Sequence, residues 1–187
     1  MCLFGFFLMV RKSNLVAAST YAFDNKKQLT RSDVTVGKNL ILVNIKWSKT
    51  NQNKDREHIV PLLEIPNSCL CPVTAYKAMV SVIPGEPSDA LFRMKHGNQW
   101  LPASYNQFQN KLKWVVARLG FDSRGYSTHS LRRGGATYAS AAGVPREYVK
   151  LVGDWKSDAV DTYIKVPLAS RVESAKVVRS AVLSESS

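Results

Sequence analysis

The length and charge of the chain restrict both its fold and its partners. Its 187 residues are enough to bury about two-thirds of the unfolded surface, so we expect one compact domain. Lys and Arg number 26 against 14 Asp and Glu, which gives a net charge of +12. That excess predicts a polyanionic partner such as a nucleic acid, although a solvated basic surface would have the same composition.

Cysteine usage and motif content exclude several classes of protein. The three cysteines include a C-x-C pair, Cys69 and Cys71, whose spacing fits neither a disulfide framework nor a zinc site. The chain has no P-loop, no Rossmann fingerprint, no H-E-x-x-H motif and no carboxylate cluster of the metal-binding type. We therefore expect no metal, no cofactor and no small-molecule substrate.

The N-terminal segment MCLFGFFLMVRK is apolar but matches no targeting or membrane signal. No positive charge precedes its apolar run and no small-residue cleavage site follows it, and about nine apolar residues are too few to span a bilayer. We interpret 3–15 as a buried helix whose beginning is cut off, with Arg11 where the helix meets a polar turn. The protein is expected to be intracellular, and nuclear if its source is eukaryotic.

A basic β-hairpin is predicted after a loop that spans residues 20–37. Its strands are KNLILVNIKW and HIVPLL, which are rich in β-branched and aliphatic residues, and the polar tip SKTNQNKDRE separates them. Such a tip can lay a lysine against a nucleic-acid backbone, or can be ordinary exposed charge. Its candidate DNA-contacting side chains are Lys46, Lys49, Lys54 and Arg56.

The chain beyond the hairpin is mainly helical. Helical spacing runs over 73–83 and over 103–119, and a strand-like segment, 89–101, lies between them. We interpret the aromatic residues Tyr105, Phe108 and Trp114 as core packing. The predicted fold class is mixed α+β, mainly α-helical, with a small antiparallel β-hairpin or sheet on one side.

The segment 127–166 contains side chains suited to holding and attacking a phosphodiester. Ser127 and Thr128 are good N-cap residues for a helix that opens at His129. Because His129 and Arg132 are three residues apart, they share a helix face and can act on the same phosphate. Glycines 134 and 135 then permit close approach by a neighbouring backbone or by DNA.

Further along, a short helix is predicted over 144–153, followed by a turn and a last helical turn that holds Tyr163. Segment 169–182 has a weak apolar period and is predicted to form a detachable helix. The final LSESS is predicted to be disordered.

The H-x-x-R pair, the aromatic Trp155 and Tyr163 eight residues further on resemble the catalytic core of the tyrosine recombinases. Two segments, HSLRRGGATYA and GDWKSDA, precede this tyrosine. Their sequences are most similar to those of recombinases from eukaryotic mobile elements of the crypton and DIRS type. The resemblance covers Arg11 to about residue 166, and it lacks the family's N-terminal core-binding domain. It implies a catalytic domain over 1–168 and a C-terminal helix and tail over 169–187.

The resemblance also implies a role for each residue and a double-stranded DNA partner. Arg11 and Arg132 would be the two arginines, and a hairpin lysine would protonate the leaving 5′ oxygen. His129 would serve as the base for Tyr163, the nucleophile of a 3′-phosphotyrosyl intermediate that needs no metal. The family works as a homotetramer in a synaptic complex, in which the C-terminal helix passes to a neighbour.

Several alternatives stay open at this stage. Lys49 is favoured over Lys46 as the catalytic lysine, because its K-T pair is more similar to the family. Trp155 has the family's distance from His129 and Asp154 has the family's distance from Tyr163. We favour Trp155, since an indole N–H can donate to a phosphate oxygen while a carboxylate repels it.

Simpler roles are also available for these residues. Trp155 would serve equally as helix packing, and Tyr163 as a half-buried core tyrosine. Arg133 and Lys156 are predicted to contact the DNA backbone. For the whole chain, the alternatives are a truncated or domesticated transposon remnant that binds DNA without cutting it, and a topoisomerase with the same chemistry.

Overall fold

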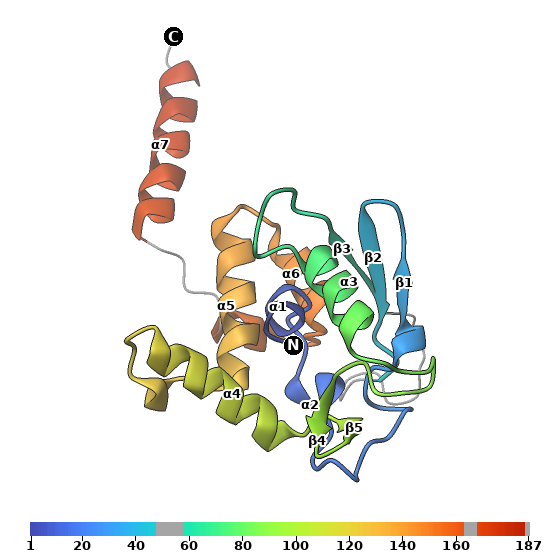
Figure 1. Cartoon of the computed structure of the whole chain (residues 1–187). Coiled ribbons are helices and arrows are strands. Elements are labelled where there is room, and N and C mark those ends of the chain that lie inside the picture. Colours follow the sequence, from blue (N-terminus) through green and yellow to red (C-terminus); the bar gives the residue numbers. More distant parts are fainter. Residues whose placement is uncertain (48–57, 163–167, 186–187) are drawn as a thin grey trace.

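The computed structural model describes residues 1–47, 58–162 and 168–185. Helices surround a short central helix, and two small antiparallel sheets lie to one side of them (Figure 1). This arrangement confirms the predicted mixed, mainly helical fold class. The α-helices are α1 Cys2–Phe7, α2 Lys12–Leu15, α3 Pro72–Val82, α4 Tyr105–Arg118, α5 Thr128–Ala141, α6 Arg146–Gly153 and α7 Leu168–Glu185. Single 3₁₀ turns are η1 Arg31–Asp33, η2 Ser123–Gly125 and η3 Asp158–Thr162.

The predicted hairpin belongs to a sheet of three strands in the order β1-β2-β3. The strands β1 Val34–Val36, β2 Leu40–Asn44 and β3 Ile59–Leu63 are all antiparallel to their neighbours. Alternate side chains of β2 and β3 are buried, as the period of two requires for a sheet with one covered face. Strand β1 lies in a stretch predicted to be loop, because its three residues are too few to show an alternating pattern.

A second, two-stranded sheet and the helix after it follow the sequence prediction closely. The strands β4 Arg93–His96 and β5 Gln99–Pro102 form a hairpin inside the strand-like segment 89–101. Helix α4 begins at a capping box in which Ser104 and Gln107 each accept the other's backbone N–H. Phe108 is 1% exposed and confirms the predicted core, whereas Trp114 is 51% exposed and that part of the prediction is wrong.

The N-terminal helix predicted over 3–15 is interrupted. Helix α1 ends at Phe7, Met9 adopts a left-handed backbone with φ of 51°, and α2 begins at Lys12. A methionine in this conformation costs free energy, so surrounding contacts must hold it there. The bend turns the chain so that Arg11 leaves the core in an extended conformation, with φ of −72° and ψ of 149°.

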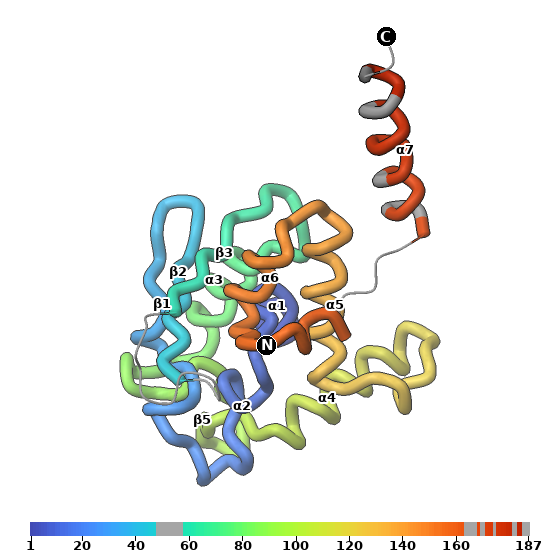
Figure 2. Tube along the Cα trace, turned by 180° about the vertical axis from the view of Figure 1, so that it is seen from behind, coloured from blue at the N-terminus to red at the C-terminus, as the bar shows by residue number. Residues whose placement is uncertain are grey.

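Helix α1 lies at the centre of the molecule and packs closely against α5 (Figures 1 and 2). A Cβ added at Gly135 would lie 2.0 Å from the carbonyl oxygen of Phe6, so the two backbones touch at this point. The glycine therefore admits a neighbouring backbone, one of the two occupants expected from the sequence. Gly134 is different, since its added Cβ would meet only the Phe6 ring at 3.5 Å.

Helix α7 stands apart from the rest of the chain (Figures 1 and 2). Its exposed apolar side chains include Val172, Val177, Val178 and Leu183. The helix continues to Glu185, so the prediction of a disordered end is wrong for residues 183–185. None of the helices within the three described ranges combines the length and the apolar character that crossing a bilayer requires.

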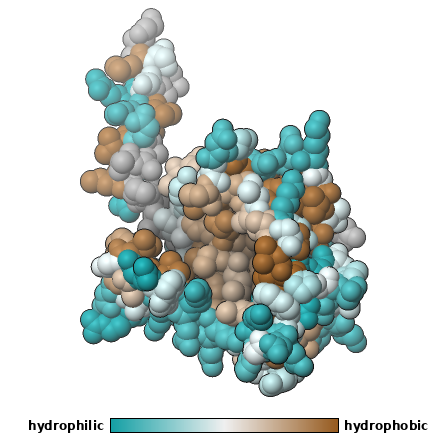
Figure 3. All heavy atoms as spheres, in the orientation of Figure 1, coloured by the Kyte–Doolittle hydropathy of each residue, from teal (hydrophilic) through white to brown (hydrophobic). Residues whose placement is uncertain are grey.

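An apolar hollow opens on the face where the N-terminal end of α1 is visible (Figure 3). On one side of α1 it includes a pocket of about 340 Å³ lined by Met1, Cys2, Leu3, Phe4, Ala75, Tyr76, Met79 and Phe92. On the other side, a pocket of about 450 Å³ is lined by Phe6, Ser130, Arg133, Gly134, Thr137, Tyr138 and Ala141.

Candidate active site

Arg132 lies at the buried centre of the site. Only 2% of its surface is exposed, and one guanidinium nitrogen donates to the carbonyl oxygen of Met9. This contact explains the left-handed Met9, because the bend directs that carbonyl toward the arginine. The guanidinium carbon lies 3.8 Å from the ring centroid of Trp155, so Arg132 is held by a backbone acceptor and by an aromatic face.

Trp155, and not Asp154, makes this aromatic contact. Asp154 caps the end of α6 in the left-handed conformation, with φ of 55°, and this turn directs the next residue back onto α6. The indole then covers Gly153 so closely that an added Cβ would lie 1.8 Å from the ring. Trp155 is 7% exposed and belongs to a small apolar cluster with Met9, Ala136, Val149 and Val160. The tryptophan therefore packs as a core residue while it orients Arg132.

Arg11 and His129 line one pocket, although they are far apart in the sequence. Arg11 comes from the start of α2 and His129 from the first turn of α5. Ser127 fixes that turn as the N-cap of α5, in a capping box with Ser130. The pocket has a volume of about 360 Å³ and is lined by Val10, Arg11, Lys12, Ser13, Tyr105, Ser127, Thr128 and His129.

The charges around His129 make the pocket suited to an anion. Partial burial and then the nearby charges of Arg132, Arg133, Arg11 and Lys12 lower the pKa of His129. At neutral pH the imidazole is therefore neutral and can accept a proton. Of these cations, Arg11 and Lys12 line the pocket itself, so an anionic phosphate there would meet positive charge beside a neutral imidazole.

Lys46 is held within the fold at the end of β2. Its ammonium forms an ion pair of 2.6 Å with Asp33 and donates to the carbonyl oxygen of Asn25 at 2.5 Å. The side chain is 21% exposed, so the ammonium of Lys46 has a structural partner within the fold. The predicted contacts of Lys49, Lys54 and Arg56 lie outside the described residues.

The strand end that leads into the hairpin tip is tied to the element that carries Arg11. The buried side chain of Asn14, in α2, donates to the carbonyl oxygen of Trp47 at 2.5 Å. The backbone carbonyl of Asn14 accepts from the N–H of Leu29 at 2.9 Å. The first bond connects the strand end before the tip to the arginine side of the pocket, and the second holds α2 against the segment around Leu29.

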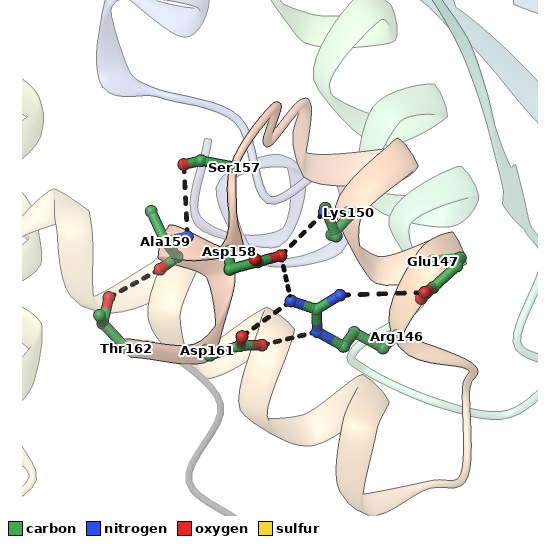
Figure 4. A network of polar contacts seen from close by, with 8 residues as sticks. All are labelled: Arg146, Glu147, Lys150, Ser157, Asp158, Ala159, Asp161 and Thr162. Atoms are coloured by element: carbon green, nitrogen blue, oxygen red, sulfur yellow. Dashed lines mark hydrogen bonds and ion pairs between the residues drawn. The ribbon is translucent and has the colours of Figure 1, made fainter.

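A network of ion pairs holds η3, the turn that immediately precedes Tyr163 (Figure 4). Arg146, at the start of α6, contacts Asp161 at 2.7 Å and Asp158 at 2.5 Å. Lys150, one turn later, contacts Asp158 at 3.2 Å. Tyr163 itself lies outside the described residues, so its predicted role as nucleophile stays a prediction.

The remaining predicted DNA contacts are exposed, and three contributors were missed. Arg133 and Lys156 are both open to solvent. The contributors not predicted are Lys12, Tyr105 and Arg146. Tyr105 packs partly on the core, as predicted, but it also lines the pocket with Arg11 and His129. The only sequence signal for Lys12 was its position directly after Arg11. No sequence signal indicated Arg146.

Solved structures of DNA recombinases resemble this chain in fold. XerH site-specific recombinase bound to difH substrate in a pre-cleavage complex matches 93% of the chain, with 15% identity and a TM-score of 0.60. Its post-cleavage complex with palindromic difH matches 95%, with 15% identity and a TM-score of 0.64. The Tn1549 transposon integrase in complex with circular intermediate DNA matches 93%, with 13% identity and a TM-score of 0.58.

These likenesses show that the chain has the fold of a tyrosine-recombinase catalytic core. The chain spans 44% of the XerH chain and 55% of the Tn1549 integrase chain. No model of a known protein family matches the sequence. A comparison with curated proteins gives no match either.

Proposed function

We propose that this protein binds double-stranded DNA and breaks and rejoins one strand at a time through a 3′-phosphotyrosyl intermediate on Tyr163. The observation that carries the proposal is the meeting of Arg11, His129 and Arg132. Two separate parts of the chain supply them, and they converge beside one pocket. Lysines and arginines that serve only solubility would be spread over the surface and would not gather beside one pocket.

The reaction follows from the chemistry of these groups. Arg11 and Arg132 bind the non-bridging oxygens of the phosphodiester and offset the negative charge that repels a nucleophile. The neutral His129 accepts the phenolic proton as the oxygen of Tyr163 attacks phosphorus. The bond from phosphorus to the 5′ oxygen breaks, and a hairpin lysine, Lys49, donates the proton that this oxygen needs. The 5′ hydroxyl of a second strand reverses these steps to rejoin the DNA.

The ion pair of Lys46 with Asp33 supports the choice of Lys49 as the acid, because moving the Lys46 ammonium to a phosphate would break a partly buried pair. Trp155 is proposed to fill the family's His or Trp position, and its contact with Arg132 supports this assignment. Arg133, Lys156, Lys54 and Arg56 are proposed as backbone contacts outside the reaction centre.

A covalent-trapping experiment tests the proposal. A duplex with a nick just 3′ of the cleavage site loses its short fragment after cleavage, so the phosphotyrosyl adduct accumulates and can be seen as a slower band on a denaturing gel. We expect the adduct with the unaltered chain and none with Y163F, while Y148F, a change in an exposed tyrosine of α6, serves as the control. An adduct of unchanged yield with Y163F would disprove the assignment of the nucleophile.

The second candidate function is DNA binding without cutting, in a truncated or domesticated relative of a mobile-element recombinase. The observation in its favour is the net charge of +12, which suits DNA binding whether or not a strand is cut. Such a protein would bind duplex DNA weakly, with a steep salt dependence, and would give no adduct at any nick position. Binding without an adduct, in a chain whose melting curve shows it to be folded, would favour this second function.

We further propose a boundary near residue 168, after which α7 serves assembly rather than catalysis. Helix α7 would dock in the apolar hollow of a neighbouring copy, within a tetramer formed on DNA. Its exposed valines and its separation from the rest of the chain support this role. Deleting 168–187 should abolish a DNA-dependent tetramer in analytical ultracentrifugation but preserve binding to a single half-site. We also propose that the protein originates from a crypton- or DIRS-type mobile element. Its expected location is the nucleus.

A further inference from the structure

The pocket that contains Arg11 and His129 has a second basic element that the reaction above does not use. Lys12 follows Arg11 in the chain and lines the same pocket. Its ammonium lies 3.2 Å from the ring centroid of Tyr105. An exposed lysine normally samples many rotamers, and contact with an aromatic face restricts it. The ammonium of Lys12 is therefore presented at a defined place in the pocket.

Tyr105 is itself fixed by the elements around it. It is the first residue of α4, directly after the Ser104 capping box. The proximity of the Lys12 ammonium, and to a smaller degree that of Thr128, lowers the pKa of Tyr105. The N–H of Thr128 donates to the side chain of Gln109, also in α4, at 3.0 Å. Helices α2, α4 and α5 thus meet at the Lys12–Tyr105 pair.

The size of the pocket leaves space beyond one phosphate. A volume of about 360 Å³ corresponds to about twelve water molecules in the liquid, which is more than one phosphate group fills. In a DNA strand the phosphates follow one another at every 3.4 Å of helix axis, so a site built for one meets its neighbours too. Lys12 lies at the part of the pocket lined by Tyr105.

We propose that Lys12 and Tyr105 form a second phosphate site, which binds the DNA phosphate next to the one that is cleaved. Lys12 makes the contact, and Tyr105 is a positioning residue that holds the lysine against its ring. This inference rests on the proposed function, because the neighbouring phosphate is defined by the one at Arg11 and His129. The second phosphate site would fix the position of the DNA strand along the pocket before any bond breaks.

The first test is the salt dependence of duplex binding, measured by fluorescence anisotropy on a labelled 20-base-pair DNA. We expect K12M to weaken binding about fivefold to tenfold and to reduce the slope of log K against log salt by about 1. K77M, which removes an exposed charge on α3 away from the pocket, is the matched control and should leave the slope unchanged. The same slope for K12M and K77M would overturn the proposal.

The positioning role of Tyr105 needs a different readout. Y105F keeps the ring and should bind nearly as the unaltered chain does, whereas Y105L removes the ring and should weaken binding like K12M. In a double-mutant cycle, K12M combined with Y105L should lose little more than either change does separately. Full additivity would show that the two side chains act independently. Circular dichroism melting of Y105L separates this result from unfolding.

A third measurement distinguishes phosphate binding from acid catalysis by Lys12. A substrate with sulfur in place of the bridging 5′ oxygen has a leaving group that needs no proton. If Lys12 binds a neighbouring phosphate, K12M stays impaired on this substrate; if the sulfur restores its cleavage rate, Lys12 is the acid and the second site is refuted. The binding slopes report on Lys12 even if no cleavage occurs, so failure of the proposed reaction would not be mistaken for failure of this inference.

Discussion

Two arginines in the C-terminal half of the chain show how differently the same side chain can be held. Arg132 is 2% exposed, and its contacts include the backbone carbonyl of Met9 and the ring of Trp155. Arg146 has a side chain that is 38% exposed and contacts three carboxylates, those of Glu147, Asp158 and Asp161. Arg146 forms several exposed ion pairs, yet we expect Arg132 to matter far more.

The difference follows from the solvent around each guanidinium. Water and salt screen an exposed ion pair, and holding two long side chains together has an entropic cost, so such pairs contribute little. A buried guanidinium has no water to replace its contacts, so its position is determined by the fold. The comparison divides the site into a rigid part around Arg132 and an adjustable part around η3.

The largest effect is expected from removing the buried arginine. R132A should lower the rate of adduct formation at least about 10³-fold, because a preorganised cation at the phosphate is lost. It should also lower the melting temperature, since the carbonyl of Met9 loses its donor at a cost of about 1–3 kcal/mol. R133A, which removes the exposed neighbour, should leave melting unchanged. Equal melting losses for the two variants would contradict the division into rigid and adjustable parts.

The next effect concerns the backbone contact behind the rigid part. G135A should destabilise the protein by about 2–4 kcal/mol, because the new methyl group would lie 2.0 Å from the Phe6 carbonyl and must push α1 away from α5. G134A is the matched control, since its methyl group would be 3.5 Å from the nearest side-chain atom. Chemical denaturation measures both, and similar midpoints for the two would show that the helices can separate without cost.

A smaller effect is expected in the adjustable part. R146A should reduce adduct formation severalfold, because η3 loses the contacts that hold the turn before Tyr163, while the melting temperature changes little. High salt should reproduce part of the loss in the unaltered chain. E147Q removes only the longest contact, at 3.8 Å, and should be neutral. If R146A lowered the melting temperature as much as R132A does, the division of the site into a rigid and an adjustable part would be wrong.

The smallest effect is the pH dependence of His129. Because its pKa is lowered in the folded chain, the unfolded chain binds more protons just below pH 6.5, so stability should fall slightly as the pH decreases through that range. A bound phosphate would offset the surrounding cations and raise the pKa of His129, so DNA should bind somewhat more tightly at pH 6 than at pH 7.5. NMR titration of the imidazole with and without DNA measures the shift, and H129Q should abolish the pH effect.

Much of the fold could be predicted because its signals are local. Helices α3 to α6 have caps, stops and apolar periods within their own sequences, and β2 and β3 have a strand pattern. The interruption at Met9 could not be predicted, since methionine does not favour a positive φ. Its cause is a hydrogen bond from Arg132, more than a hundred residues later.

The candidate site was predictable in composition but less so in geometry. The residue types and the spacing of His129 and Arg132 indicated a phosphate site. The contact of Trp155 with Arg132 depends on the left-handed backbone at Asp154, which a spacing rule cannot express, and the catalytic role of Trp155 stays a prediction. Lys46 was predicted to contact DNA, and nothing in the sequence indicated its ion pair with Asp33, which lies on a different element. The DNA contact itself stays a prediction.

The contact between Gly135 and the Phe6 carbonyl has a thermodynamic consequence for the free protein. By fixing α1 against α5, it helps to hold the cations of Arg11 and Lys12 near that of Arg132 before any DNA is present. Their mutual repulsion is then built into the folded state and is relieved when an anion binds. Any polyanion that enters this pocket should act as a folding ligand. A short duplex, or even inorganic phosphate at high concentration, should therefore raise the melting temperature in proportion to the logarithm of its concentration.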